Sequence, residues 1–537
     1  MKTNRFMLGL LLGGASILGF TSCEDRLDIP QNGNVSTQED YYQTDDEIDT
    51  AVAEIYSYWR SQYCNLMMVV TELSDDVMNG GQGDGDGKDY QKLNEHYFDT
   101  NSRAIKTLYT NLYTLIYYCN LVIDNVEANS DKAKQAVADA KFFRAYSYYY
   151  LATLWGETVP LVDHLLSTDE YFVERSAAGA VWSLVKSDLQ DAINVLPSKS
   201  SVNDKEANFR VTKEAAEVML AKAYMWQPLP DYSSAAAQLE NVINSGKYAL
   251  YTGDWLDLFH VEGNNCCEKV LEVQCPDDYS NFANNGYRDS NHFFVYATWA
   301  GTRFFHLDQQ ATGFAGGGWN FLHPREGVYN TFVAEEGVDG YRLNRTMKTG
   351  DQMEALGFIK GGVDPMYCHD IYFGWKFELH MSDLMGGTWS GMCPDNCFIN
   401  YSIIRYAEVL LLDAECQLQM GNNEKAANYL NQVRQRAQLA AKSNITLEDI
   451  KIEKRMEFWN EGVRYLDLLR WGDAYEALKD QGKKVVNLDY DKSKGGYYTY
   501  VVYEQPFAGF VQGKHELLPI PQTELDCNPN MTQNTGY

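Results

Sequence analysis

Residues 404–437 read IRYAEVLLLDAECQLQMGNNEKAANYLNQVRQRA, and no other part of the sequence indicates the architecture as clearly. Apolar side chains recur every three or four positions on both sides of Gly421, which predicts two amphipathic helices joined by a short turn. The first stripe is Ile404, Ala407, Leu411, Ala414 and Leu418, and the second is Ala426, Leu430, Val433 and Ala437.

The pair has the length of one unit of a helical repeat. It spans 34 residues, which is the period of a tetratricopeptide repeat. Residues 212–246 suggest a second copy, although Pro228 and Pro230 crowd its turn. We therefore expect a mostly α fold on a tetratricopeptide-like helical scaffold.

Two further helices are predicted outside these pairs. Residues 131–155 carry a stripe of small and aromatic residues, and Gly156 follows where a left-handed cap is expected. Thr446 and Asp449 form a capping-box pattern that opens a long helix, which we expect to run without a break to Gly472.

The middle of the chain differs from both flanks. Between 262 and 400 the helical stripes fade, while glycine and aromatic residues increase. We expect one domain over 46–537, in which an N-terminal helical part (46–261) and a C-terminal part (401–537) support an irregular, loop-rich lobe (262–400) with short strands. The tyrosine-rich stretch 485–511 is expected to form strand or loop.

The first 22 residues are typical of a signal peptide, because a short apolar stretch follows Lys2 and Arg5. The sequence Leu-Gly-Phe-Thr-Ser-Cys ends this segment and resembles a bacterial lipoprotein cleavage site. Cys23 is then the expected lipid anchor, since several acyl chains hold a protein stably at a membrane. Residues 23–45 are expected to form a lipidated polar tether.

The net charge argues against one class of partner, and the cysteine content limits the disulfide bonds that we expect. The net charge of −29 disfavours nucleic acid, because an acidic surface repels phosphate backbones. Of eleven cysteines, Cys393 with Cys397 and the vicinal Cys266 and Cys267 could pair, and we expect one or two disulfides. Cys64, Cys119 and Cys416 lie on helical patterns where buried free thiols are common.

Six segments in order resemble the SusD/RagB family. These are YYCNLVIDNV (117–126), AKFFRAYSYYYLATLWGETVPLV (140–162), FRVTKEAAEVMLAKAYMW (209–226), IIRYAEVLLLDAEC (403–416), EKRMEFWNEGVRYLDLLRWG (453–472) and LLPIPQTELDCNPNMTQNTGY (517–537). One departure is Trp155-Gly156-Glu157, where typical members have Tyr-Gly-Asp.

The resemblance implies a lipid-anchored outer-membrane protein that captures oligo- or polysaccharide. It also implies a SusC-like TonB-dependent transporter as partner, over which the receptor closes as a lid. Four charged residues within the matching helices are expected to form structural ion pairs, because buried arginine must meet carboxylates or carbonyls. They are Arg144, Arg405, Arg464 and Asp467.

A glycan site needs flat aromatic rings, which stack on the C–H faces of sugars, and fixed polar groups for the hydroxyls. The irregular lobe contains Trp299, Trp319, Trp375 and Trp389 near Tyr296, Arg303, Asn320 and Arg325. Each tryptophan could instead belong to the core of the lobe. Trp319 is the strongest candidate for exposure, because three glycines precede it.

The loop 74–91 offers a second set of candidates. The family resemblance places ligand contacts in the loop after this early helix, which makes Asn79 and Tyr90 candidates. Asp84 and Asp86 alternate with glycines and could bind Ca²⁺, although the spacing is not that of an EF-hand. The alternative is a plain loop, too polar and flexible to pack.

We expect a binding protein that is not an enzyme and requires no cofactor, and three alternatives stand beside this expectation. A helical glycan-degrading enzyme would need two carboxylates across one cleft. A receptor for peptides or glycoproteins would present strand edges or backbone-reading grooves instead of aromatic surfaces. A purely structural lid would help the transporter close and bind ligand poorly.

Overall fold

The computed structural model describes residues 41–275, 296–302, 313–315, 318–384 and 398–537. The predicted signal peptide, Cys23 and most of the tether therefore lie outside the described residues. Within the described residues, no helix combines the length and the apolar character that crossing a membrane requires.

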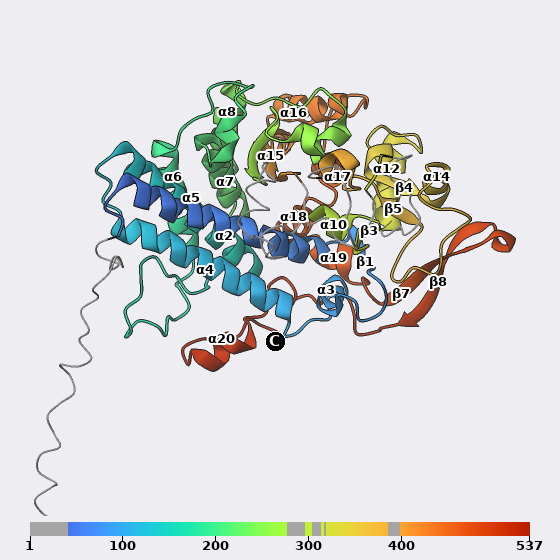
Figure 1. Cartoon of the computed structure of the whole chain (residues 1–537), viewed down its shortest axis with the longest axis horizontal. Helices are drawn as coiled ribbons and strands as arrows, with labels where there is room; N and C mark the ends of the chain where they lie inside the picture. Colours follow the sequence, from blue (N-terminus) through green and yellow to red (C-terminus); the bar gives the residue numbers. More distant parts are fainter. Residues whose placement is uncertain (1–40, 276–295, 303–312, 316–317, 385–397) are drawn as a thin grey trace, which may run out of the picture.

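The scaffold is a series of helices, each packed against the next. Figure 1 shows α2, α4 and α5 side by side as the longest helices of the molecule. The scaffold helices are α2 (Asp45–Glu72), α4 (Arg103–Asn125), α5 (Asp131–Trp155), α6 (Ala180–Val195), α7 (Lys213–Trp226), α8 (Tyr232–Asn244), α15 (Tyr406–Gln419) and α16 (Asn423–Arg436). Since α8 packs against α15, the two predicted pairs stack directly, which confirms the helical-repeat scaffold.

Local sequence signals explain where these helices begin. Thr44 and Glu47 form a capping box at the start of α2, and the Ser130 hydroxyl accepts the amide hydrogen of Ala133 at the start of α5. Helix α5 ends at Trp155 as predicted. Gly156 has φ 95° and ψ 156°, so the expected left-handed cap is wrong. The C-terminal segment approaches there, and a Cβ on Gly156 would lie 3.1 Å from Leu517.

The predicted long helix after Thr446 is two helices. Its capping box is present, but α17 (Leu447–Glu457) ends before α18 (Arg464–Trp471) begins. Asn460 and Gly462 lie between them with positive φ, and a Cβ on Gly462 would meet the Met67 sulfur at 2.9 Å. Periodicity missed this break because the apolar spacing continues across it.

The lobe contains short strands, as predicted, and one longer helix that the sequence reasoning missed. Figure 1 shows most of the lobe on the far side of the molecule from α4 and α6. Its elements are β2 (Lys269–Val273), α10 (Tyr296–Ala300), β3 (Leu322–Pro324), α12 (Glu326–Glu336), α13 (Leu343–Thr346), β4 (Met347–Thr349), α14 (Gly350–Ala355) and β5 (Tyr372–Gly374).

Four separate two-stranded antiparallel sheets connect distant segments. Strand β1 (Val77–Asn79) pairs with β3, and β6 (Tyr401–Arg405) pairs with β2. Strands β4 and β5 pair within the lobe. The predicted strand-like tail is the hairpin of β7 (Lys484–Asp491) and β8 (Gly496–Glu504), which projects from the body in Figure 1.

A buried ion network joins the lobe to the scaffold. The Arg405 guanidinium donates to Glu268, Glu457 and Glu461, and the side chain is 1% exposed. Arg342 of the lobe donates to Glu457 from the other side at 3.0 Å. Every charge in this network has an opposite partner, which offsets the cost of burial.

The other predicted structural ion pairs are also present. Arg144 donates twice to Asp188, at 2.8 and 2.9 Å, and Arg464 donates to both oxygens of Asp75. Asp467 pairs with Lys454 at 2.6 Å and with Arg470 at 2.8 Å. These contacts confirm that the family-like charged residues tie helices together.

The C-terminal signature closes the fold over the end of α5. The Trp155 indole donates to the Pro519 carbonyl at 2.9 Å, and the Asn534 amide donates to the Trp155 carbonyl at 3.0 Å. These bonds fix the last residues of the chain onto a helix almost four hundred positions earlier in the sequence.

Cysteine chemistry differs from the expectation. All eight cysteines among the described residues are free thiols, including Cys266 and Cys267. Cys64, Cys119 and Cys416 are buried, as predicted. Cys393 and Cys397 lie outside the described residues, so their pairing stays a prediction.

Candidate functional site

Four aromatic side chains from separate segments meet where α2, the early loop and the lobe join. This aromatic cluster consists of Tyr90, Trp299, Trp319 and Phe321. The ring of Trp299 lies 5.2 Å from Tyr90, 5.1 Å from Trp319 and 4.7 Å from Phe321, measured between centroids. Phe321 is buried beneath, whereas the other three are half-buried and therefore reach the surface.

The backbone fixes both tryptophans. Residues 318–321 run along α10, and the amides of Trp319 and Phe321 donate to the carbonyls of Thr298 and Trp299 at 2.6 and 3.0 Å. A Cβ on Gly318 would lie 2.0 Å from the Gly301 carbonyl, so this approach requires glycine. The indoles thus stand on a rigid support, which lowers the entropic cost of binding a ligand.

The glycine-rich loop packs against the cluster. Gly81 and Gly87 have positive φ, and a Cβ on either would lie 2.6 or 2.7 Å from the Phe321 ring. The amide of Gly80 donates to the Phe321 carbonyl at 3.3 Å. The expectation that this loop is too polar and flexible to pack is wrong, because its glycines let bare backbone lie on the ring.

Uncharged polar groups border the cluster. The Asn65 amide donates to the Tyr90 hydroxyl at 3.3 Å. Burial raises the pKa of Tyr90 to about 12, which keeps its hydroxyl neutral at physiological pH. Two buried oxygen atoms beside the cluster, Asn65 Oδ1 and Thr298 Oγ1, have no hydrogen-bond partner among the described residues.

Five of the predicted ligand residues lie outside the aromatic cluster. Tyr296 is 1% exposed and donates to Thr71 and Asn460, and Trp375 packs in a core of the lobe with Phe358 and Phe373. Both are core residues, which is the alternative that the sequence left open.

The polar candidates are structural as well. Asn79 donates to Glu72 and is 1% exposed, and Arg325 donates to the Val77 carbonyl and to Asn94. Asn320 is 2% exposed and has φ 66°, a backbone conformation that asparagine tolerates. These three residues hold the strands and turns beneath the cluster. Trp389 and Arg303 lie outside the described residues.

Of the predicted set, the structure brings together Trp299, Trp319 and Tyr90. Sequence reasoning missed Phe321, which supports the indole of Trp299, and Asn65, which bonds to Tyr90. Phe321 gave a weak signal as the first apolar residue after Trp319-Asn320. Asn65 gave none, because its role depends on the approach of α3 (Lys88–Asn94) to α2.

The predicted calcium ligands have other partners. Asp84 accepts a hydrogen bond from Lys88 at 2.6 Å, which lowers the pKa of Asp84, whereas Asp86 accepts the amide hydrogen of Gln82 at 2.8 Å. Calcium requires six to eight oxygen ligands around one point. Within the described part of the chain, these two carboxylates belong to no group of metal-ligating side chains.

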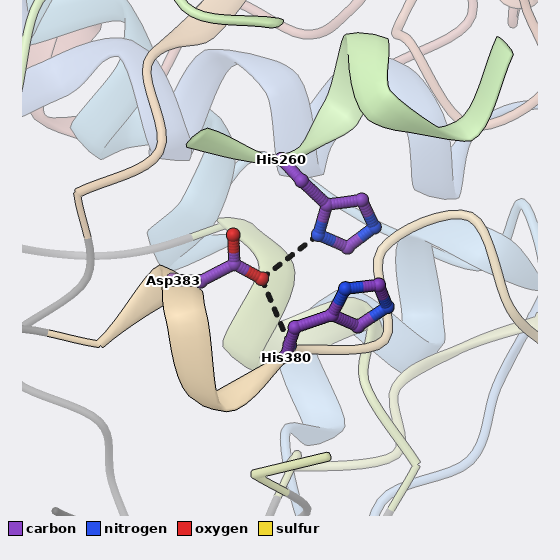
Figure 2. A group of neighbouring side chains, drawn as sticks. All are labelled: His260, His380 and Asp383. Atoms are coloured by element: carbon purple, nitrogen blue, oxygen red, sulfur yellow. Dashed lines mark hydrogen bonds and ion pairs between the residues drawn. The ribbon is translucent and has the colours of Figure 1, made fainter. Parts of the chain in front are cut away.

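One group of three metal-ligating side chains occurs among the described residues, and it joins His260, just before the lobe, to His380 and Asp383 within the lobe (Figure 2). His260 Nδ1 and the backbone amide of His380 both lie 2.8 Å from one carboxylate oxygen of Asp383. The two imidazole rings are stacked, with centroids 4.0 Å apart and planes 13° from parallel. Stacked rings direct their lone pairs side by side rather than toward one ion, so the geometry favours a structural hydrogen-bonded group.

The comparisons with known proteins agree with this fold. The sequence model of the SusD family matches residues 328–537, and a second model, described as "Starch-binding associating with outer membrane", matches residues 36–225. SusD-like protein P25 of Formosa agariphila is 24% identical over 96% of this chain and 97% of its own length. The starch-binding protein SusD of Bacteroides thetaiotaomicron is 21% identical over 84% of this chain and 82% of its own length.

Solved structures show the same fold. A laminarin-binding SusD-like protein superposes with a TM-score of 0.73 at 24% identity, covering 92% of this chain and 99% of its own. Surface glycan-binding protein A from Bacteroides thetaiotaomicron, in complex with laminarihexaose, superposes with a TM-score of 0.72 at 23% identity, covering 92% and 100%. The chain belongs to the SusD/RagB family, whose members are binding proteins rather than enzymes.

Proposed function

We propose that this protein is a cell-surface lipoprotein that captures oligo- or polysaccharide at the aromatic cluster and delivers it to a SusC-like TonB-dependent transporter. The observation that carries the proposal is the pair of half-exposed indoles, Trp299 and Trp319, held on a rigid backbone beside Tyr90. Flat rings of this kind stack on the C–H faces of sugars, while neutral hydroxyl and amide groups bond to sugar hydroxyls.

The relatives support a glycan as the ligand. Of the similar proteins, one is a laminarin-binding protein, one was solved in complex with laminarihexaose, and one is a starch-binding protein. We therefore expect a neutral glucan or a related neutral polysaccharide at the cluster. The buried Asn65 and Thr298 oxygens beside the cluster, which have no hydrogen-bond partner among the described residues, would select among sugars by their hydroxyl positions.

The anchor and the transporter are supported by the leader sequence and by the family. Cys23 follows a signal-like segment, and the name of one matching family model specifies association with the outer membrane. Mass spectrometry of the protein purified from its own membrane should show Cys23 as a diacylglyceryl cysteine. A free Cys23 in the purified protein would remove the anchoring part of the proposal.

Peptides are the second candidate ligand, because the structure contains an open strand. In the described part of the chain β8 pairs with β7 alone, which leaves one edge of β8 for a peptide backbone. Tyr500, Val501 and Val502 on this strand are exposed.

Affinity electrophoresis tests the proposal. The chain from Glu24 onward runs through gels that contain laminarin, starch or other neutral glycans, alongside Trp319→Ala and Tyr117→Ala. Tyr117 is the control because it is a 54% exposed aromatic residue on α4, outside the cluster. One glycan should retard the wild type and Tyr117→Ala but not Trp319→Ala. Binding of casein peptides but of no glycan would replace the glycan proposal with peptide capture.

A further inference from the structure

A second groove lies on the scaffold, away from the aromatic cluster. It has a volume of about 590 Å³ and is bordered by the first half of α2, the segment 208–211 and strand β2. Helix α2 contributes to both sites. Tyr56 lies in this groove, and Asn65, which bonds to Tyr90 of the aromatic cluster, follows it by nine residues. Nine helical residues correspond to roughly 14 Å along the axis and half a turn around it, so the two sites are on different faces of the helix.

The groove combines aromatic walls with a cation. Tyr56, Trp59 and Phe209 line it, and Phe209 is 55% exposed. Arg60 also lines the groove, and no described carboxylate pairs with it. Its charged neighbours do have partners, since Arg210 pairs with Asp139 and Asp49 pairs with Lys132. Glu272 in the wall pairs with Lys269.

Arg60 differs from the other half-buried arginines that lack a carboxylate. Arg175 and Arg325 donate to carbonyl and amide oxygens instead, whereas no described residue accepts from Arg60. The sequence contains 74 acidic and 45 basic residues, so carboxylates are in excess. A buried guanidinium N–H without an acceptor is costly, and such groups normally meet an anion. Arg60 Nε is buried and has no acceptor among the described residues, so this guanidinium is available to an anion.

Buried atoms without partners indicate what that partner offers. Arg60 Nε, Arg210 Nε and Asn208 Nδ2 are donors without an acceptor, whereas Asn208 Oδ1 is an acceptor without a donor. Asn208 itself is 5% exposed, so water does not readily satisfy its amide. Glu272 Oε1 also has no hydrogen-bond donor, but it lies 3.4 Å from the Lys269 ammonium, which balances its charge. The surplus of donors matches a ligand rich in acceptors, and the Asn208 acceptor matches one hydroxyl.

We propose that this groove binds the oxyanion of an acidic sugar, either a uronic acid carboxylate or a sulfate ester, against Arg60. The anion accepts from the Arg60 guanidinium, which can bind two oxygens of one planar or tetrahedral group. The Asn208 amide bonds to a hydroxyl of the same ring, and Tyr56 and Phe209 cover its apolar face. The groove is independent of the aromatic cluster, and neither site requires the other.

Calorimetric titration of the chain from Glu24 tests this site. The probes are a galacturonic acid trimer, a sulfated disaccharide and an uncharged trimer of galactose. The variants are Arg60→Gln, Arg60→Lys and Asn208→Ala, with Arg345→Gln as the control that removes an equal charge at a surface pair. Arg345 suits this purpose because it pairs with Asp254 and neither residue lines the groove.

At least one acidic probe should bind the wild type, and Arg60→Gln should weaken it at least about tenfold. Arg60→Lys should recover part of the affinity, and Arg345→Gln and Trp319→Ala should match the wild type. The carboxylate and sulfate probes distinguish the two sources of the anion. Equal binding to the wild type and Arg60→Gln, or no binding of either acidic probe, would overturn the proposal. Loss of neutral-glycan binding in Trp319→Ala tests the aromatic cluster separately.

Discussion

His96 illustrates how one buried titratable residue affects the stability of this protein. Its ring is 1% exposed, lies beside His515 and interacts through Nε2 with the Leu73 carbonyl at 3.0 Å. Burial, followed by the nearby His515, lowers the pKa of His96 to about 3. Unfolded histidine has a pKa of about 6.5, so the unfolded chain takes up a proton below that pH and the folded chain does not.

We predict that His96 makes the protein less stable in mild acid. Its contribution to stability is complete above pH 6.5 and decreases as the pH falls toward 3. His96→Gln removes this titration. The difference in the free energy of unfolding between wild type and variant should therefore narrow by about 2 kcal/mol from pH 7 to pH 5. Urea unfolding of both proteins at pH 7 and pH 5 measures this difference in the free energy of unfolding.

The control is His164→Gln. His164 is exposed, and its hydrogen bonds to Asp163 and Glu170 raise rather than lower its pKa. The difference in the free energy of unfolding between wild type and His164→Gln should not narrow in acid. A constant difference for His96→Gln between pH 7 and pH 5 would mean that His96 is protonated in the folded protein.

At the residue scale, the sequence predicted side-chain chemistry better than side-chain position. It selected Trp299 and Trp319 because flat rings suit sugars, and Tyr90 because of its place in the family-like early loop. The structure places these three side chains together. It could not exclude Tyr296, since aromatic composition is the same in a core and on a surface. Which rings are exposed depends on packing between segments that are two hundred residues apart.

At the scale of elements, the glycine-rich loop determines the shape of the aromatic cluster. Gly87 lies against Phe321 with φ 61°, whereas a Cβ on Gly83 would meet no atom within 4 Å. Gly87→Ala should displace the loop or the Phe321 ring, because the added methyl overlaps the ring and the backbone is strained for alanine.

We expect Gly87→Ala to weaken glycan binding about tenfold, which is about 1.4 kcal/mol, and Gly83→Ala to leave it unchanged. The same affinity electrophoresis measures both variants. Normal binding by Gly87→Ala would show that the loop does not support the site.

The helices themselves were largely predictable, because their apolar periodicity and caps are local properties of the sequence. The break between α17 and α18 was not. It is imposed by Glu457 and Glu461, which converge on Arg405, and by the close approach of α2 to Gly462. A tertiary requirement therefore overrides a continuous helical pattern at this break.

At the scale of the whole molecule, the buried ion network around Arg405 links the lobe to the scaffold. Arg405→Met should leave Glu268, Glu457 and Glu461 buried with too little positive charge, at a cost of about 3–5 kcal/mol. Thermal unfolding should show this loss. Lys479→Ala, which removes an exposed pair with Glu476, should leave the unfolding temperature nearly unchanged, because water screens an exposed pair. Equal effects of the two substitutions would contradict the role of the network.

The central claim is that a sugar binds on the indoles where scaffold and lobe meet. The most direct measurement is a crystal structure of the chain with the neutral glycan that affinity electrophoresis selects. We predict a sugar ring stacked on Trp319 or Trp299, with its hydroxyls hydrogen-bonded to the polar groups of Tyr90 and Asn65. A glycan bound elsewhere, with the aromatic cluster bare, would contradict it.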